Sequence, residues 1–145
     1  MKFVVAIDGS RVAKHALAAA LDLAAEMRTP AELHAVAVAD YAMPPAGLAK
    51  APADAPDLLG DEARVALDVA CEIAAARGFT IEAHLLRGHV SVQILEFARS
   101  IGANLIAAGT HGRKGLARAL VGSTCERLVR QAEIPVLTVR GEDVS

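Results

Sequence analysis

Residues 3–38 read FVVAIDGSRVAKHALAAALDLAAEMRTPAELHAVAV, and this stretch decides the fold class. The continuous apolar run at 3–7 is typical of a strand buried on both faces of a parallel sheet. A turn at 8–10 ends in a serine that can cap a helix, and apolar side chains then recur at helical spacing over 11–27. A second apolar strand is predicted at 33–38. The stretch thus predicts a strand, a helix and a second strand in succession.

The alternation continues along the rest of the chain. Helices are predicted over 61–77, 91–101 and 123–132, strands over 80–86, 104–108 and 135–140, and a proline-rich loop over 41–60. This order predicts a single α/β domain over residues 1–145, with a parallel sheet, right-handed crossovers and helices on both faces. In the helix at 61–77, the spacing predicts one buried and one solvated face. The buried face would hold Val65, Val69, Ile73 and Ala76, and the solvated face Arg64, Asp68 and Glu72.

Composition excludes several classes of function. The chain has 145 residues, a formal net charge of −2 and 3% aromatic residues, so it offers neither a field that attracts nucleic acid nor a base-stacking platform. Cys71 and Cys125 form no CxxC motif and are expected to be core residues, and the five histidines show no metal-ligand spacing. No apolar run reaches transmembrane length and no signal-peptide pattern follows Met1. We therefore expect a cytoplasmic protein with no nucleic-acid or membrane partner.

Two predicted strands end in residues that could bind a ligand. The tripeptide DGS at 8–10 follows the first strand, and GTHG at 109–112 follows the fourth. In open α/β sheets, ligands bind beyond the carboxyl ends of the strands, where the strand order reverses. If these two strands are neighbours, both ends face one crevice. Asp8 and Ser10 also have a purely structural interpretation, as an Asx-turn and the N-cap of the first helix.

The stretch 109–124 reads GTHGRKGLARALVGST and is suited to hold phosphates. Glycines let backbone N–H groups approach an anion, and the helix that opens at Ser123 offers free N–H groups at its positive end. Positive charge is added by three side chains, Arg113, Lys114 and Arg118. Asp8 would repel phosphates, so we expect it to serve the ribose or adenine end of a nucleotide. Neither a Walker A motif nor GxGxxG is present, which disfavours a P-loop NTPase and a nicotinamide dehydrogenase.

Four positions in this stretch have a distinctive spacing. Gly109, Gly112, Gly122 and Ser123 follow the pattern Gly, two residues, Gly, nine residues, Gly, then Ser or Thr. In this pattern, and in the flanking stretches KFVVAIDGS, LHAVAV and IPVLTVR, the chain resembles the ATP-binding branch of the universal stress protein family. The resemblance covers essentially the whole chain.

The resemblance implies a Rossmann-like fold of the adenine nucleotide alpha hydrolase type, with a parallel sheet of five strands in the order 3-2-1-4-5. It also implies an ATP-binding regulatory module of the bacterial stress response, with Mg²⁺ beside the phosphates and no metal held by protein side chains alone. By matching positions, Ala6 and Ala35 would line the adenine pocket, with backbone hydrogen bonds from Ala35. The full set of implied nucleotide-binding residues is Ala6, Asp8, Ala35, Ala108, Gly109, Gly112, Arg113, Gly122, Ser123 and Thr124.

The resemblance further implies a homodimer that pairs through the last strand, here Val136–Val139, which would otherwise be an exposed edge.

Two other classes of function remain. One is a dimeric interaction module with a vestigial nucleotide site, because the small Ala35 and Ala108 would contact adenine loosely. The other is an enzyme on the same frame, such as a nucleotidyl transferase or an electron-transfer flavoprotein subunit. No catalytic constellation is visible in the sequence, so no catalytic residue is assigned and at most slow ATP hydrolysis or autophosphorylation is expected.

Overall fold

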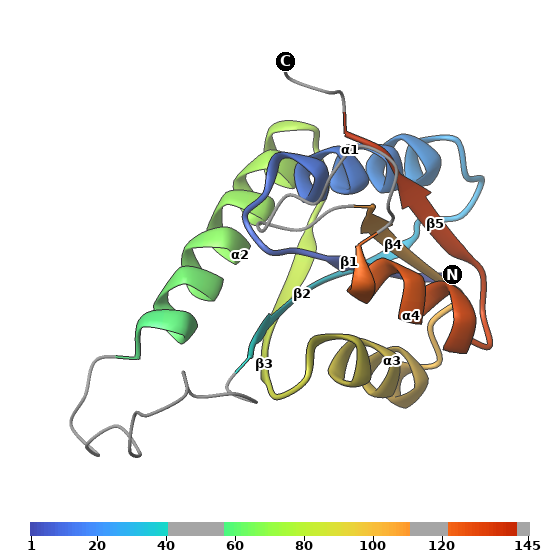
Figure 1. Ribbon diagram of the computed structural model, residues 1–145. Helices are drawn as coiled ribbons and strands as arrows, with labels where there is room; N and C mark the ends of the chain where they lie inside the picture. The colour runs from blue at the N-terminus through green and yellow to red at the C-terminus, as the bar shows by residue number, and fades with distance from the viewer. Residues whose placement is uncertain (41–56, 111–121, 142–145) are drawn as a thin grey trace, which may run out of the picture.

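The computed structural model describes residues 1–40, 57–110 and 122–141 (Figure 1). Strands and helices alternate along these residues, as the sequence predicts. In chain order the elements are β1 (Lys2–Ala6), α1 (Arg11–Ala25), β2 (Glu32–Ala39), α2 (Leu58–Ala76), β3 (Ile81–Arg87), α3 (Val90–Ile101), β4 (Leu105–Gly109), α4 (Ser123–Gln131) and β5 (Val136–Val139). Most of the proline-rich segment, residues 41–56, lies outside the described residues.

The strands form one parallel sheet in the order β3-β2-β1-β4-β5, which confirms the expected topology. Val5 in the central strand β1 is registered with Ala35 in β2 and with Ala107 in β4. Helices α1 and α2 cover one face of the sheet, and α3 and α4 cover the other (Figure 1). The strand order reverses between β1 and β4, so the carboxyl ends of these two strands meet where α/β folds bind their ligands.

The core consists of two apolar layers, one on each side of the sheet. Phe3 and Val5 of β1 belong to the layer under α1 and α2, whereas Val4 belongs to the layer under α3 and α4. All three side chains are at most 1% exposed. Burying a side chain of this size contributes about 1.5–3 kcal/mol, so β1 is fixed firmly between the layers. The turn that follows it is therefore held in a defined position.

Helix α2 begins earlier than the sequence predicts. The expected loop extends to residue 60, but α2 starts at Leu58 because Asp57 caps it. The Asp57 carboxylate accepts a hydrogen bond of 3.1 Å from the Gly60 N–H, and it also receives a bond of 2.7 Å from the guanidinium of Arg87 at the end of β3. These contacts stabilise the first turn of α2, where the sequence lacks the helical spacing of apolar residues.

The predicted buried face of α2 is wrong at Val65 and Ala76, which are exposed, whereas Ile73 packs against the core as predicted. The side chains that pack on the sheet belong to Ala63, Ala66, Leu67, Ala70 and Ala74, whereas Val65 is 63% exposed. Alanine side chains allow the helix backbone to approach β2 and β3 closely, and this close packing decides which stripe faces inward. The solvated face, with Arg64, Asp68 and Glu72, is as predicted.

Within residues 1–40, 57–110 and 122–141, no helix has the length and apolar character needed to cross a membrane.

Candidate functional site

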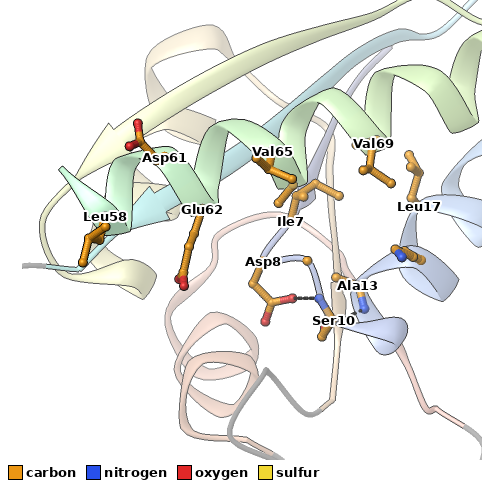
Figure 2. Close-up of a pocket in the computed structure, with 14 residues that line it drawn as sticks. Ile7, Asp8, Ser10, Ala13, Leu17, Leu58, Asp61, Glu62, Val65 and Val69 are labelled. Carbon is orange, nitrogen blue, oxygen red and sulfur yellow. Dashed lines mark hydrogen bonds between the residues drawn. The ribbon is translucent and has the colours of Figure 1, made fainter. Parts of the chain in front are cut away.

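The turn after β1 is held by two side-chain hydrogen bonds (Figure 2). Oδ1 of Asp8 accepts a hydrogen bond of 2.9 Å from the backbone N–H of Ser10, and the Ser10 hydroxyl oxygen accepts one of 3.1 Å from the Ala13 N–H as the N-cap of α1. Gly9 has a φ of 82°, the left-handed conformation that this turn needs. The structural interpretation of Asp8 and Ser10 is confirmed. Oδ2 of the half-buried Asp8 has no hydrogen-bond partner among the described residues.

Strand β4 ends tightly packed against α1. A Cβ on Gly109 would collide with Cγ1 of Val12 and would lie 3.0 Å from the Val12 carbonyl carbon. The next residue, Thr110, donates its backbone N–H to the Val139 carbonyl at 2.9 Å. The Thr110 side chain is buried, and within the described part of the chain its Oγ1 has no hydrogen-bond partner. A buried hydroxyl in this state costs about 1–3 kcal/mol.

Helix α4 begins beside the end of β4. The backbone N–H of Gly122 donates a hydrogen bond to the Thr110 carbonyl. Gly122 is the N-cap residue and has no side-chain cap, and the helix proper begins at Ser123. The first N–H groups of a helix have no intrahelical partner, and the helix dipole makes this end positive. The N-terminus of α4 therefore offers several donors to an anion.

The structure brings five of the predicted nucleotide-binding residues to one edge of the sheet. Because β1 and β4 pair side by side, the turn after β1, the end of β4 and the start of α4 share this edge. We call it the carboxyl edge, and it holds Asp8, Gly109, Gly122, Ser123 and Thr124. Five positions of interest between the glycines lie outside the described residues, namely His111, Gly112, Arg113, Lys114 and Arg118.

The other three predicted residues are strand residues. Ala35 is fully buried in β2, where it is registered between Val5 of β1 and Ala83 of β3. Its backbone groups therefore face two neighbouring strands. Ala108 is buried in the layer under α3 and α4, and the half-buried Ala6 packs against the same layer. None of these three residues lines the cavity beside the carboxyl edge.

That cavity has a volume of about 550 Å³ and lies between α1 and α2, next to the turn after β1 (Figure 2). Apolar side chains line much of it, among them Ile7, Leu17, Val65 and Val69. Charged side chains also line it, namely Asp8, Lys14, Asp61 and Glu62. Arg64 pairs with Asp61 at 2.7 Å, and the remaining carboxylates still outnumber the one ammonium group, so this lining disfavours phosphates. The apolar walls favour an uncharged ring or chain. Of the predicted nucleotide-binding residues that the structure describes, Asp8 alone lines the cavity.

Sequence reasoning missed this cavity because it assigned the valine stripe of α2 to the core. The spacing of Val65 and Val69 does signal an apolar stripe. It does not reveal that the alanine stripe beside it packs on the sheet and leaves the valines to face α1 across an open space.

Comparisons with known proteins identify the family. A model of the universal stress protein family matches residues 1–140. The chain belongs to the universal stress protein family. A universal stress protein from Methanocaldococcus jannaschii is 37% identical, over 96% of this chain and 81% of its own. A crystal structure of a family member from Burkholderia pseudomallei is 36% identical, with a TM-score of 0.70 over 94% of this chain and 93% of that one. A universal stress protein in complex with cAMP is 27% identical, with a TM-score of 0.72 over 96% of each chain.

The carboxyl edge of this universal stress protein combines two kinds of group. The N–H groups at the start of α4 are donors that suit phosphate oxygens. The Asp8 carboxylate is an acceptor that suits a hydroxyl or amino group. An arrangement of donors at one end and an acceptor at the other fits a ligand with an anionic end and a hydroxylated or aminated end.

The two cysteines of this universal stress protein have weakly reactive thiols. Cys125 is buried in the first turn of α4, and burial raises the pKa of its thiol. Cys71 on α2 is half-buried, and burial together with the nearby Asp68 charge raises the pKa of its thiol. Because the thiolate is the reactive form, both groups are suppressed as nucleophiles at neutral pH.

Proposed function

We propose that this universal stress protein binds an adenine nucleotide, ATP, at the carboxyl edge. The observation that carries the proposal is the hydrogen bond from the Gly122 N–H to the Thr110 carbonyl. It sets the free N–H groups of α4 beside the end of β4, where a phosphate chain would meet several backbone donors. The cAMP complex of the 27% identical relative supports an adenine nucleotide as the ligand.

The charges favour one orientation of the nucleotide. Asp8 lies in a lining that also contains Glu62 and the Arg64-paired Asp61, and the net negative charge of these groups would repel phosphates. The adenosine end therefore goes toward Asp8, and the phosphates go toward Gly122 and Ser123. Gly112 and Arg113 would complete the phosphate site, and Mg²⁺ would accompany the phosphates. The buried Thr110 hydroxyl, which has no partner within the described residues, is a polar group that fits such a ligand.

The role that follows is regulatory. A bound nucleotide would set the conformation or the partners of the domain during the stress response, with ATP hydrolysis slow at most. The first test is direct: freshly purified protein is denatured and the released nucleotides are quantified per chain by ion-pair chromatography. Near-stoichiometric ATP supports the proposal. A protein that is empty, and that takes up no added ATP with Mg²⁺, would instead be an interaction module with a vestigial site.

A substitution at Gly122 tests the position of the site. The backbone there has φ −57° and ψ 151°, a conformation that valine adopts readily. Gly122→Val should therefore fold, while its side chain blocks the approach of phosphate to the α4 N–H groups. We expect ATP binding to be lost. Ala75→Val, at an exposed position near the far end of α2, is the matched control and should bind ATP normally. Wild-type ATP affinity in Gly122→Val would refute this position.

We also propose that the protein forms a homodimer through β5. This strand is at one edge of the sheet and pairs with β4 alone within the described residues. An unpaired strand edge is a template for another chain. The carbonyls of Pro135 and Val139 accept hydrogen bonds from β4 and Thr110, so by alternation the backbone groups of Val136 and Thr138 point outward.

The dimer is tested at Thr138. Thr138→Pro removes an outward N–H group while leaving the bonds to β4 in place, so we expect a monomer by light scattering. Thr138→Val retains the N–H group and should remain dimeric. A wild-type protein that is monomeric at high concentration would overturn this part of the proposal and leave nucleotide binding untouched.

A further inference from the structure

Four ionisable side chains gather on the sheet face under α3. Glu32 and His34 lie on β2, and Glu82 and His84 lie on β3. The parallel register pairs His34 with Glu82 and Val36 with His84, so these side chains share the face that carries Val36 and Leu86. Glu32 begins β2 and Glu82 is the second residue of β3. This group, the β2–β3 histidine cluster, therefore lies toward the amino ends of the strands, away from the carboxyl edge.

Three of these side chains converge on one point. Nδ1 of His34 lies 3.0 Å from Nε2 of His84. The Glu82 carboxylate lies beside both rings, 3.7 Å from His34 Nδ1 and 3.8 Å from His84 Nε2. All three ligand atoms lie within 4.8 Å of one another. Two ring nitrogens at this distance can be joined by one proton or by one metal ion.

Glu32 and Phe97 hold the two rings in this arrangement. Nε2 of His34 lies 2.7 Å from Oε1 of Glu32, so the Nε2–H donates to that carboxylate and the Nδ1 lone pair faces His84. This hydrogen bond holds the pKa of Glu32 below its usual value. The ring of Phe97 on α3 packs 4.4 Å from the His84 ring and 5.8 Å from the His34 ring, centroid to centroid. A carboxylate behind a ligating histidine is a common feature of metal sites, because it sets the tautomer and the ring orientation.

We propose that His34 Nδ1, His84 Nε2 and the Glu82 carboxylate bind a divalent transition-metal ion, Zn²⁺ in the first place. Imidazole and carboxylate are ligands that Zn²⁺ accepts, and three protein ligands leave a fourth position for water. Zn–N bonds of about 2.0–2.1 Å in a tetrahedron place two nitrogens roughly 3.3 Å apart, so the rings need to separate by only a few tenths of an ångström. The His84 Nε2 proton moves to Nδ1 of the same ring when the metal binds.

The site is accessible on one side and closed on the other. The His34 side chain is 4% exposed, whereas the Glu82 side chain is 65% exposed and the His84 side chain 21%. An ion can therefore enter past Glu82. Because β3 is an edge strand, the bound ion would clip it to β2. A ligand that binds the native state alone raises its stability.

Zinc titration of the full chain tests the proposal. Protein that has been stripped with a chelator and kept free of nucleotide is titrated with Zn²⁺ by calorimetry, and with Co²⁺ to record the visible absorption of a tetrahedral site. We expect one ion per chain and a higher Tm with Zn²⁺. Without stoichiometric Zn²⁺ binding, the two rings share only a proton and the proposal is overturned.

Variants show whether the ion binds at this cluster. Glu82→Gln changes an exposed side chain and should fold normally, and His84→Gln removes a ring nitrogen. Each should weaken Zn²⁺ binding by more than the about 10- to 100-fold loss expected for Glu32→Ala, which removes the carboxylate that accepts the hydrogen bond from His34. The matched controls His15→Gln on α1 and Glu72→Gln on α2 should bind Zn²⁺ like the wild type. Unchanged Zn²⁺ affinity in both Glu82→Gln and His84→Gln would overturn the proposal, and unchanged affinity in Gly122→Val separates this site from the nucleotide site.

Discussion

The backbone N–H of Gly122 donates a hydrogen bond to the carbonyl of Thr110, so helix α4 begins where strand β4 has just ended. This one contact joins two residues that are twelve positions apart in the sequence. It also sets the positive end of a helix against the point where the strand order reverses. The sheet topology and a single backbone hydrogen bond therefore position the residues of the carboxyl edge.

The buried Thr110 hydroxyl should make the nucleotide-free wild-type protein less stable than a variant that lacks the hydroxyl. Thr110→Val removes a polar atom that has no partner among the described residues, so we expect about 1 kcal/mol of added stability in urea unfolding. If a nucleotide satisfies the hydroxyl, the variant should bind ATP more weakly than the wild type. Thr80→Val, at an exposed position, is the control for both measurements. A loss of stability in nucleotide-free Thr110→Val would show that the hydroxyl already has a partner.

Close packing against Val12 requires a glycine at position 109, whether or not a ligand binds there. In Gly109→Ala the new Cβ meets Cγ1 of Val12, and we expect a loss of about 1–3 kcal/mol in the free energy of unfolding. Adding Val12→Ala removes Cγ1 and should restore part of that loss. The two single variants and the double variant form a cycle whose coupling should exceed 0.5 kcal/mol, whereas additive effects within about 0.5 kcal/mol would contradict the contact.

Ser10 should contribute to stability through its cap. Ser10→Ala removes the acceptor for the Ala13 N–H at the start of α1, and we expect a loss of about 1 kcal/mol in denaturant unfolding. The control is Ser100→Ala, because the Ser100 hydroxyl donates to the Phe97 carbonyl on an exposed helix surface. Equal effects of the two substitutions would argue against a specific cap.

One substitution separates the structural role of Asp8 from its proposed role in nucleotide binding. Asp8→Asn retains Oδ1 as an acceptor for the Ser10 N–H, although a neutral one, so we expect stability to fall by no more than about 1 kcal/mol. The variant lacks the charge, and a hydrogen bond to a charged acceptor is stronger than one to a neutral acceptor by about 1 kcal/mol. ATP affinity should therefore fall by roughly tenfold. Unchanged ATP affinity would restrict Asp8 to its structural role.

The cysteines should resist alkylation in the native protein. Burial raises the pKa of both thiols, which reduces their thiolate fraction near neutral pH. We expect iodoacetamide to modify Cys125 most slowly, Cys71 somewhat faster and both rapidly once the protein is unfolded, as measured by mass spectrometry over time. Rapid labelling of native Cys125 would show that the first turn of α4 opens readily.

The fold was predictable because its signals are local. Apolar runs such as 3–7 mark buried strands, and helical spacing over 11–27 marks the helix between them. The start of α2 was not predictable in this way. It depends on Asp57, whose carboxylate also pairs with Arg87, thirty residues further along the chain.

The candidate site likewise has features that local sequence predicts and features that depend on tertiary packing. The glycine spacing and the Asp8 turn are short motifs, and the sequence alone determined that they exist and that they follow two parallel strands. Tertiary packing decided the rest. The alanine stripe of α2, rather than its valine stripe, packs on the sheet, because small side chains allow a closer approach and leave a cavity against α1. The register of β2 and β3 places Nδ1 of His34 3.0 Å from Nε2 of His84, although the two residues are fifty positions apart in the sequence. No local periodicity predicts this contact, because it forms only when the two strands hydrogen-bond to each other.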